Sequence, residues 1–308
     1  MNEILISIIV PHYNSPDTLS KLLTSIGSHD DVETIVVDDR STALVEEYDK
    51  CREAFESETV VFLSNTTERK GAGTSRNVGL EKARGKWLLF ADADDYMLPN
   101  WYDTVKAYTS CDHDIVFFMP DGDQRTGRHR PFAQLIDDVN ENMPWAETRL
   151  RYQFFPPWSK LIRKAMVDEN QIQFGETRYS NDVLFSIKTG FYAKSVLVSN
   201  ESIYFLYEQE NSLTKQISFE SIRIRNGVSC EAYAFLKGKI SRREMNNIYL
   251  VNTPLSTMRG ALKRGYGWAS VKELRRQYRE VKFPLINLSY DNVRRMLKKR
   301  FGKKKAKK

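Results

Sequence analysis

Cysteine is scarce in this chain of 308 residues, and the three that occur, Cys51, Cys111 and Cys230, lie far apart without a CxxC pair. This spacing argues against a disulfide framework and against a zinc site, and it fits a reducing cytoplasm. The chain has no run of about 18 consecutive apolar residues, so no transmembrane helix is expected. The first residues, MNEILISIIVPHYN, carry a short apolar run behind an acidic leader and do not resemble a signal peptide.

What is present is ordinary for a soluble globular protein: 41% hydrophobic and 28% charged residues, enough to bury one large core or two smaller ones. The net charge of +7 is unevenly distributed, because Lys and Arg dominate residues 291–308 against a single Asp. Such a tail binds nucleic acid or anionic lipid, or is merely solvated, and the sequence leaves these alternatives open.

The first 120 residues alternate apolar runs with amphipathic segments. The expected strands are Ile4–Val10, Glu33–Val37, Thr59–Leu63, Lys86–Ala91 and Asp114–Met119. The expected helices between and after them are Asp17–Ser28, Thr42–Ser57, Ala72–Arg84 and Pro99–Thr109. Repeated strand–helix–strand units predict an α/β fold with a mostly parallel central sheet flanked by helices.

After Pro120 the pattern loosens into DGDQRTGRHRP, which predicts a surface loop, and regular structure is expected again near Phe154. The later predictions are a helix at Ser180–Ala193, strands at Ser195–Ser199 and Ser202–Tyr207, and basic helices at Ser221–Lys237, Arg242–Lys263, Ser270–Val281 and Asp291–Phe301. We therefore divide the chain into a first domain at 1–215, with halves at 1–120 and 121–215, and a basic helical extension at 216–308.

Polar residues gather where three of the expected strands end: Pro11–Asn14, Asp38–Ser41 and Asp92–Asp95. In open parallel sheets ligands bind at the carboxyl ends of the strands, so these residues form one constellation. Asp92, Asp94 and Asp95 follow the apolar run WLLF, and carboxylates packed this closely at the mouth of a core strand need a compensating cation. Asp-x-Asp spacing suits Mg²⁺ or Mn²⁺ bound together with a diphosphate, although the motif alone is weak evidence beside an acidic turn.

The segment RKGAGTSRNVG, residues 69–79, lies between the third and fourth expected strands. Its glycines permit close backbone approach, and the helix amino terminus offers free N–H groups to an anion. Arg69, Lys70 and Arg76 would neutralise part of a diphosphate. The structural alternative is a glycine-rich turn whose arginines face water.

The order PHYN, VDDRS and GAGTSRNVGLEKARGKWLLFADADD closely resembles the nucleotide-sugar-binding half of glycosyltransferase family two, the inverting enzymes of the GT-A fold, in their bacterial surface-polysaccharide branch. The resemblance covers roughly residues 4 to 100. It implies that Pro11 and Tyr13 line a nucleoside pocket and that Asp38 and Asp39 match the family's paired aspartates. Asp39 is then the expected contact to the uracil edge, and Arg40 stands where the family commonly has glycine.

The same resemblance implies that Arg76 lies near the nucleotide. It also makes Asp94 the more direct metal ligand, with Asp92 toward the ribose or a metal-bound water. Farther along, the family's Glu-Asp pair reads Asn181-Asp182, and Asp182 is the implied catalytic base. Taken alone, Asp182 would be a helix-capping residue.

Two acceptor-side contacts are expected at Trp158 and Lys160, and Asn211–Thr214 falls where relatives have a loop that closes over the donor. The resulting hypothesis is a cytoplasmic, Mn²⁺- or Mg²⁺-dependent transferase that moves a sugar from a nucleotide donor, expected to be UDP-linked, to a saccharide or lipid-linked saccharide. The basic helices and tail would hold it against an anionic membrane surface, and no nucleic acid is expected as a partner. The alternatives are a sugar nucleotidyltransferase, which would release pyrophosphate, and a nucleic-acid-binding protein that uses the basic extension.

Overall fold

The computed structural model describes residues 3–125, 127–207, 217–248 and 254–284. Its centre is a seven-stranded sheet in the order β3-β2-β1-β4-β8-β6-β9. These strands span Val60–Ser64, Val32–Asp38, Ile6–His12, Trp87–Phe90, Lys160–Arg163, Ile115–Phe118 and Val196–Ser199, respectively. The neighbours β3, β2, β1 and β4 run parallel, and so do β6 and β9. The predicted α/β class with a mostly parallel sheet is confirmed.

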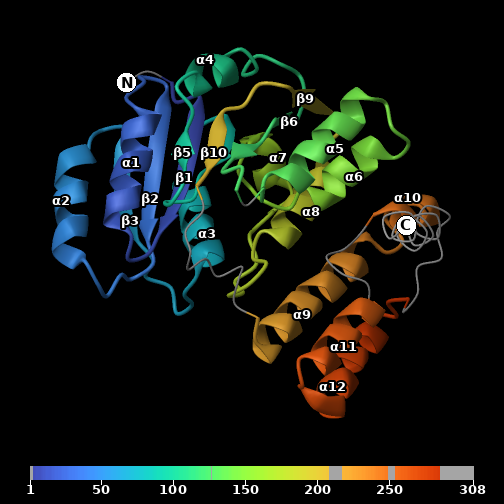
Figure 1. The fold of residues 1–308 in the computed structure, drawn as a ribbon. Coiled ribbons are helices and arrows are strands. Elements are labelled where there is room, and N and C mark those ends of the chain that lie inside the picture. Colours follow the sequence, from blue (N-terminus) through green and yellow to red (C-terminus); the bar gives the residue numbers. More distant parts are fainter. Residues whose placement is uncertain (1–2, 126, 208–216, 249–253, 285–308) are drawn as a thin grey trace, which may run out of the picture.

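The first helices cover the sheet, as the alternation of apolar runs requires (Figure 1). Helices α1, α2, α3 and α4 span Pro16–Ile26, Val45–Phe55, Ala72–Lys82 and Trp101–Lys106. Every residue of β2 and β4 is buried, which explains why these strands read as continuous apolar runs rather than alternating ones. All five strands and four helices expected in the first 120 residues are present, with ends shifted by a few residues.

The stretch after Pro120 is more regular than its polar composition suggests. It contains α5 (Arg130–Asn140) and α6 (Ala146–Gln153), so the prediction of a loop extending to Phe154 was wrong. A small second sheet joins β5 (Tyr96–Met97), β10 (Tyr204–Leu206) and β7 (Asp121–Gly122). Strand β8 was not expected, and it inserts antiparallel between β4 and β6.

Helices α7 (Lys164–Glu169) and α8 (Val183–Tyr192) complete this part, and α8 carries residues of the candidate site at its amino end. The carboxyl-terminal helices are α9 (Phe219–Leu236), α10 (Arg242–Asn247), α11 (Pro254–Lys263) and α12 (Gly267–Glu280). A cluster of buried side chains from α6, α8 and α9 joins them to the sheet domain; its members include Tyr152, Val183, Ile187, Val228, Ala232 and Leu236. Figure 1 shows α9 below α8, with α11 and α12 on the far side of α9.

Among the described residues, no helix combines the length and apolarity that a membrane crossing requires. The domain boundary expected at 215 and the loop Asn211–Thr214 lie outside the described residues, as do the predicted helix Asp291–Phe301 and the Lys-rich tail. The single helix expected at Arg242–Lys263 is α10 and α11 in the structure, with residues 249–253 between them outside the description.

Candidate active site

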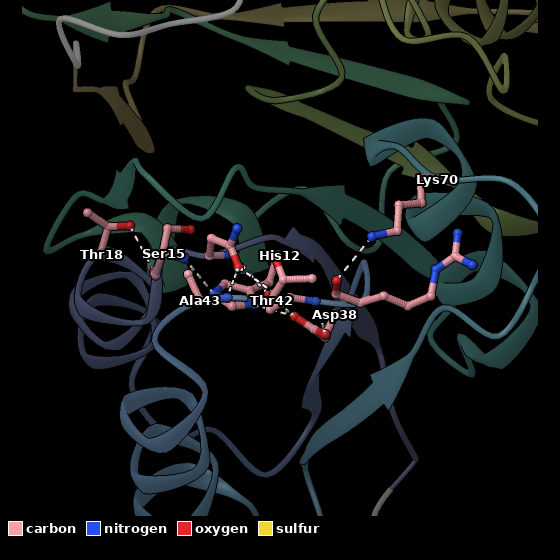
Figure 2. A network of polar contacts seen from close by, with 10 residues as sticks. His12, Ser15, Thr18, Asp38, Thr42, Ala43 and Lys70 are labelled. Carbon is pink, nitrogen blue, oxygen red and sulfur yellow. Dashed lines mark hydrogen bonds and ion pairs between the residues drawn. The ribbon is translucent and has the colours of Figure 1, made fainter.

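The ends of β1 and β2 are joined by a buried network around His12 and Asp38 (Figure 2). The Nε2 atom of His12 accepts the backbone N–H of Ser15 at 3.1 Å, so Nδ1 carries the proton and donates to Asp38 at 2.9 Å. Asp38 also accepts the hydroxyl and the backbone N–H of Ser41. Burial alone would raise the pKa of Asp38, but these hydrogen bonds outweigh it and hold that pKa below its usual value. The network fixes the loop that follows β2.

The side chain of Asp39 instead contacts residues that follow β3, the strand beside β2. One of its carboxylate oxygens accepts the side-chain amide of Asn65 at 2.6 Å, and the other accepts the backbone N–H of Gly71 at 2.7 Å. Asn65 is fully buried and also donates to the carbonyl of Arg69. Asp39 therefore anchors the start of the glycine-rich segment to the end of β2.

The outer rim of this corner is formed by Tyr13 and Lys70. Tyr13 is 49% exposed, and the Lys70 ammonium lies 5.5 Å from the centre of its ring. Lys70 also donates to the carbonyl of Arg40, and this bond joins the loop before α3 to the loop after β2 (Figure 2). Arg40 has a φ of 60°, a left-handed backbone conformation that favours glycine. An exposed ring beside a cation at a strand end is suited to stacking on a flat, anionic ligand.

Asp92, Asp94 and Asp95 gather at the end of β4, and their carboxylate oxygens lie within 4.8 Å of one another. Tyr204 donates its hydroxyl to Asp95 at 2.7 Å, and the backbone N–H of Tyr207 donates to the other oxygen of Asp95. The Tyr204 hydroxyl oxygen in turn accepts the backbone N–H of Asp92. Strand β10 therefore holds Asp95 in place behind the other two carboxylates.

The electrostatics of this cluster fit a divalent cation. Burial, together with the charge of Asp92, raises the pKa of Asp94 to about 6. Burial and the two neighbouring carboxylates raise the pKa of Asp95 well above its usual value. Hard oxygen ligands are what Mg²⁺ and Mn²⁺ prefer, and a cation would offset this mutual repulsion. Asp92 and Asp94 would hold it, with Asp95 behind them.

Arg76 is the buried centre of the site. Its guanidinium donates to Asp92 at 2.5 Å and to the side-chain oxygen of Asn181 at 2.9 Å, and it lies 5.3 Å from the centre of the Phe174 ring. The side chain is only 6% exposed. One cation therefore links the acidic cluster after β4 to the segment that leads into α8.

Two further residues of α3 fix that segment. The Asn77 side chain donates to the carbonyl of Phe174 and accepts its backbone N–H, as a neighbouring strand would. A Cβ atom at Gly73 would lie 2.1 Å from the carbonyl oxygen of Gly175 and 2.8 Å from Cβ of Asn181, so only glycine allows this approach. The sequence GTSRN thus docks residues 174–181 directly against α3.

Asp182 lies at the N-cap of α8, but its side chain makes no capping hydrogen bond. The capping interpretation therefore has no support in this structure. Burial raises the pKa of Asp182, and the nearby charges of Arg76 and Lys160 partly offset this effect. A carboxylate held close to a cation, with a raised pKa and no capping bond, is suited to accept a proton.

Trp158 and Lys160 lie in the interior, at 5% and 2% exposure. Lys160 donates to the carbonyl of Phe154 at 2.5 Å and to the Ser186 hydroxyl at 3.1 Å. Burial lowers the pKa of Lys160 to about 7, although Asp182 acts in the opposite direction. Both side chains pack beneath the site, so their direct contact with an acceptor stays a prediction that this placement does not favour.

The structure brings most of the expected residues to one edge of the sheet. Pro11 lies near the end of β1 and Tyr13 follows that strand, and Asp38 ends β2 with Asp39 directly after it. Arg76 pairs with Asp92 and contacts Asn181, the residue before Asp182. The residues that support them were not predicted: Asn65, Asn77 and Tyr204. Asn65 comes directly after a strand, a position that already pointed to the site, whereas nothing in the local sequence marks Tyr204.

Comparison with known proteins agrees with this geometry. The family model of glycosyl transferase family 2 matches residues 7–171. The chain belongs to this family. The family resemblance of the sequence motifs is therefore confirmed.

Among curated relatives, the poly(ribitol-phosphate) beta-glucosyltransferase of Bacillus spizizenii is 30% identical over 213 residues, covering 65% of this chain and 32% of the relative. The poly(ribitol-phosphate) beta-N-acetylglucosaminyltransferase TarS of Staphylococcus aureus is 30% identical over 209 residues, covering 65% and 35%. The chain therefore spans about a third of the length of these two relatives.

Solved structures confirm the fold. The 1–349 fragment of S. aureus TarS in complex with UDP-GlcNAc gives a TM-score of 0.58 at 21% identity, over 90% of this chain and 92% of that one. The mannosyltransferase PcManGT from Pyrobaculum calidifontis, in complex with GDP-Man and Mn²⁺, also gives 0.58, at 16% identity, over 92% and 85%. The expected GT-A fold with a helical carboxyl-terminal part is confirmed.

Proposed function

We propose that this family 2 protein is an inverting, metal-dependent glycosyltransferase that moves one sugar from a UDP-linked donor to a saccharide or lipid-linked saccharide in bacterial surface-polysaccharide assembly. Names of relatives support this class, since two of them act on poly(ribitol-phosphate) and a structural neighbour is a complex with UDP-GlcNAc. The divalent ion is supported by the Asp cluster and by the Mn²⁺ complex of another neighbour.

One observation carries the proposal: the buried Arg76 guanidinium contacts both Asp92 and Asn181. Through these contacts the Arg76 guanidinium joins the carboxylates of the donor side to the segment that carries Asp182. A transferase needs this proximity, since the anomeric carbon must lie between a stabilised leaving group and a base.

In the reaction, the acceptor hydroxyl attacks the anomeric carbon from the face opposite the nucleotide, and the bond to the diphosphate oxygen breaks with inversion. Asp182 accepts the hydroxyl proton as general base. Tyr13 and the loop held by Asp38 and Asp39 position the nucleoside. A divalent cation held by Asp92 and Asp94 would stabilise the negative charge that develops on the departing diphosphate.

Asp182→Asn tests the assignment of the base. We expect it to bind UDP and Mn²⁺ as the wild type does in calorimetry and to lose transfer by a factor of about 10² to 10⁴, the usual contribution of general base catalysis. Asp94→Ala should instead lose metal-dependent UDP binding. Asp168→Asn is the matched control, because Asp168 lies on α7 and its carboxylate, 54% exposed, pairs with Lys164 at the surface. Full transfer by Asp182→Asn would show that another group is the base.

Product analysis tests the reaction class in the same assay. A glycosyltransferase releases UDP from the sugar donor, whereas a nucleotidyltransferase consumes a nucleoside triphosphate and releases pyrophosphate. Steeply salt-dependent binding to DNA or RNA, without any need for Asp94 or Asp182, would favour the nucleic-acid alternative.

Attachment to an anionic membrane surface is part of the proposal. The Lys-rich tail lies outside the described residues, but the exposed face of α12 already carries Lys272, Arg275 and Arg279, with Trp268 at 71% exposure near its start. Each such cation contributes about 1 kcal/mol near an anionic leaflet. Flotation with anionic liposomes, with and without residues 285–308, tests this attachment. We expect the full chain to float more than the shortened one, and equal flotation would remove the membrane role of the tail.

A further inference from the structure

A pocket lies in the carboxyl-terminal helical part, among α9, α11 and α12. It has a volume of about 290 Å³. Its lining includes Arg225, Asn226 and Arg264. This volume is at the lower end of the range of small-molecule sites, so the pocket suits one small unit rather than a whole nucleotide sugar.

The charge of the lining is one-sided. Arg225 and Arg264 contribute two guanidinium groups, and the lining contains no Asp or Glu from the part of the chain that the structure describes. Each guanidinium uses a nitrogen locally, Arg225 toward the Ser221 hydroxyl and Arg264 toward the carbonyl of Gly260. An arginine carries five N–H donors, so both retain donors for a ligand. This arrangement favours an oxyanion such as a phosphate.

Asn226 adds a requirement that an oxyanion alone does not meet. The residue is 4% exposed, and its Nδ2 donates to the Gln277 side chain at 2.6 Å. Its Oδ1 is buried and has no hydrogen-bond partner among the described residues. A buried unpaired acceptor costs about 1–3 kcal/mol, so this oxygen calls for a donor. A dianionic phosphate offers acceptors only, whereas a hydroxyl group supplies the missing donor.

The pocket is connected to the catalytic side of the protein. The Arg225 guanidinium lies over the Tyr179 ring at 4.8 Å from its centre, and Tyr179 belongs to the segment that leads directly into Asp182. Helix α9, which carries Arg225 and Asn226, packs on α8, which begins after Asp182. The pocket is thus built on the acceptor side of the site, away from the nucleotide edge of β1 and β2.

We propose that this pocket is an acceptor subsite that binds a polyol phosphate unit, with the phosphate on Arg225 and Arg264 and a hydroxyl donating to Asn226. The inference rests on the proposed function, because it takes the bound unit to be part of the acceptor chain. It assigns the helical extension a role in selecting an anionic, phosphate-bearing acceptor over a neutral glycan.

Calorimetry on the full chain, with saturating UDP and Mn²⁺, tests the subsite with three probes: sn-glycerol 3-phosphate, inorganic phosphate and glycerol. We expect glycerol 3-phosphate to bind about tenfold more tightly than inorganic phosphate and glycerol to show no binding, because only the first offers both groups. Binding of glycerol 3-phosphate that is seen only when UDP is left out would place it in the donor site and overturn the proposal.

Two variants localise the binding. Arg264→Gln, at an exposed position on the rim, should weaken glycerol 3-phosphate about tenfold, whereas the neighbouring Lys263→Gln, which removes the same charge outside the pocket, should not. Asn226→Asp should abolish binding through repulsion of the phosphate. Equal affinities in Arg264→Gln and Lys263→Gln, or no binding to the wild type, would refute the subsite.

Measurement of UDP binding to the same preparations distinguishes a failure of the subsite proposal from a failure of the proposed function. If UDP and Mn²⁺ bind and glycerol 3-phosphate does not, the subsite is wrong and the proposed function stands. If UDP does not bind to the wild type at all, the proposed function fails independently of the pocket.

Discussion

Removal of the Arg76 guanidinium is the sharpest test of how the site is held together. In Arg76→Gln, the Asp92 carboxylate loses a charged partner at 2.5 Å, and Asn181 loses one at 2.9 Å. Breaking one side of a buried ion pair costs about 3–5 kcal/mol. The Asp92 side chain is 34% exposed, so water recovers part of this loss. We therefore expect a loss of about 3 kcal/mol in the free energy of unfolding without metal.

Divalent metal should reduce this loss in the free energy of unfolding. Without Arg76 the three carboxylates after β4 have no ion pair with a described residue, so a bound Mn²⁺ gains more in the variant than in the wild type. A ligand at a concentration of 100 Kd stabilises the native state by about 2.7 kcal/mol. Urea unfolding of both proteins with and without saturating Mn²⁺ measures the difference. We expect most of the loss in Arg76→Gln to disappear with Mn²⁺.

The chain offers a matched control in Arg69. Its guanidinium also pairs with a carboxylate, Glu176 at 3.0 Å, but its side chain is 70% exposed. Exposed pairs contribute about 0–1 kcal/mol, so Arg69→Gln should barely change stability and should not respond to Mn²⁺. If Arg76→Gln lost as little as Arg69→Gln, or if Mn²⁺ left its loss unchanged, the account of Arg76 as the counter-ion of a metal site would be wrong.

Three further outcomes test separate parts of the site. Asp182 must be ionised to accept a proton, and burial raises its pKa. In a pH–rate profile, kcat/KM for transfer should therefore rise with pH through a midpoint above the ordinary carboxyl pKa of 3.8. A midpoint at or below that value would contradict the assignment of Asp182 as the base. Gly73→Ala places a Cβ 2.1 Å from the carbonyl oxygen of Gly175 and should displace Asn181. We expect the rate of transfer in a steady-state assay to fall by about tenfold or more, while the affinity for UDP changes less. Arg40→Gly should raise the free energy of unfolding, measured in urea, by about 0.5 kcal/mol. Glycine relieves the strain of the left-handed backbone at φ 60°, about 1–2 kcal/mol, and this gain exceeds the entropy that glycine adds to the unfolded chain. Destabilisation would show that the Arg40 side chain contributes to the fold.

The nucleotide half was predictable because three of its strands, β1, β2 and β4, are almost entirely buried. A residue such as Val36 or Leu88 in the centre of a covered sheet must be apolar, so the strands appear as continuous runs separated by amphipathic helices. The polar residues that interrupt these runs then mark the strand ends. The same rule located Asp38 and Asp92 without any knowledge of their contacts.

The middle of the chain was misread for two different reasons. Strand β8 is short and has Lys160 and Arg163 at its ends, and an antiparallel insertion breaks the strand–helix–strand rhythm. Burial of Lys160 depends on the carbonyl of Phe154, six positions before it, and on the hydroxyl of Ser186, 26 positions after it, and no periodic pattern reveals these contacts. Helix α5, by contrast, has the apolar spacing Phe132, Leu135, Ile136 and Val139, a helical signal that the polar sequence before it obscured.

The contacts that make the site depend on tertiary structure alone. Arg76 and Asn181 are 105 positions apart, and only the packing of α3 on the segment before α8 brings them together. This contact also gives a physical meaning to the replacement of the family's Glu by Asn181. An amide accepts one hydrogen bond from Arg76 without adding a second negative charge, so the guanidinium keeps its positive charge for Asp92 and for Asp182, whose pKa it lowers. A carboxylate at position 181 would compete for that charge and raise the pKa of Asp182 further, so the neutral residue favours the ionised form that the proposed role of Asp182 requires.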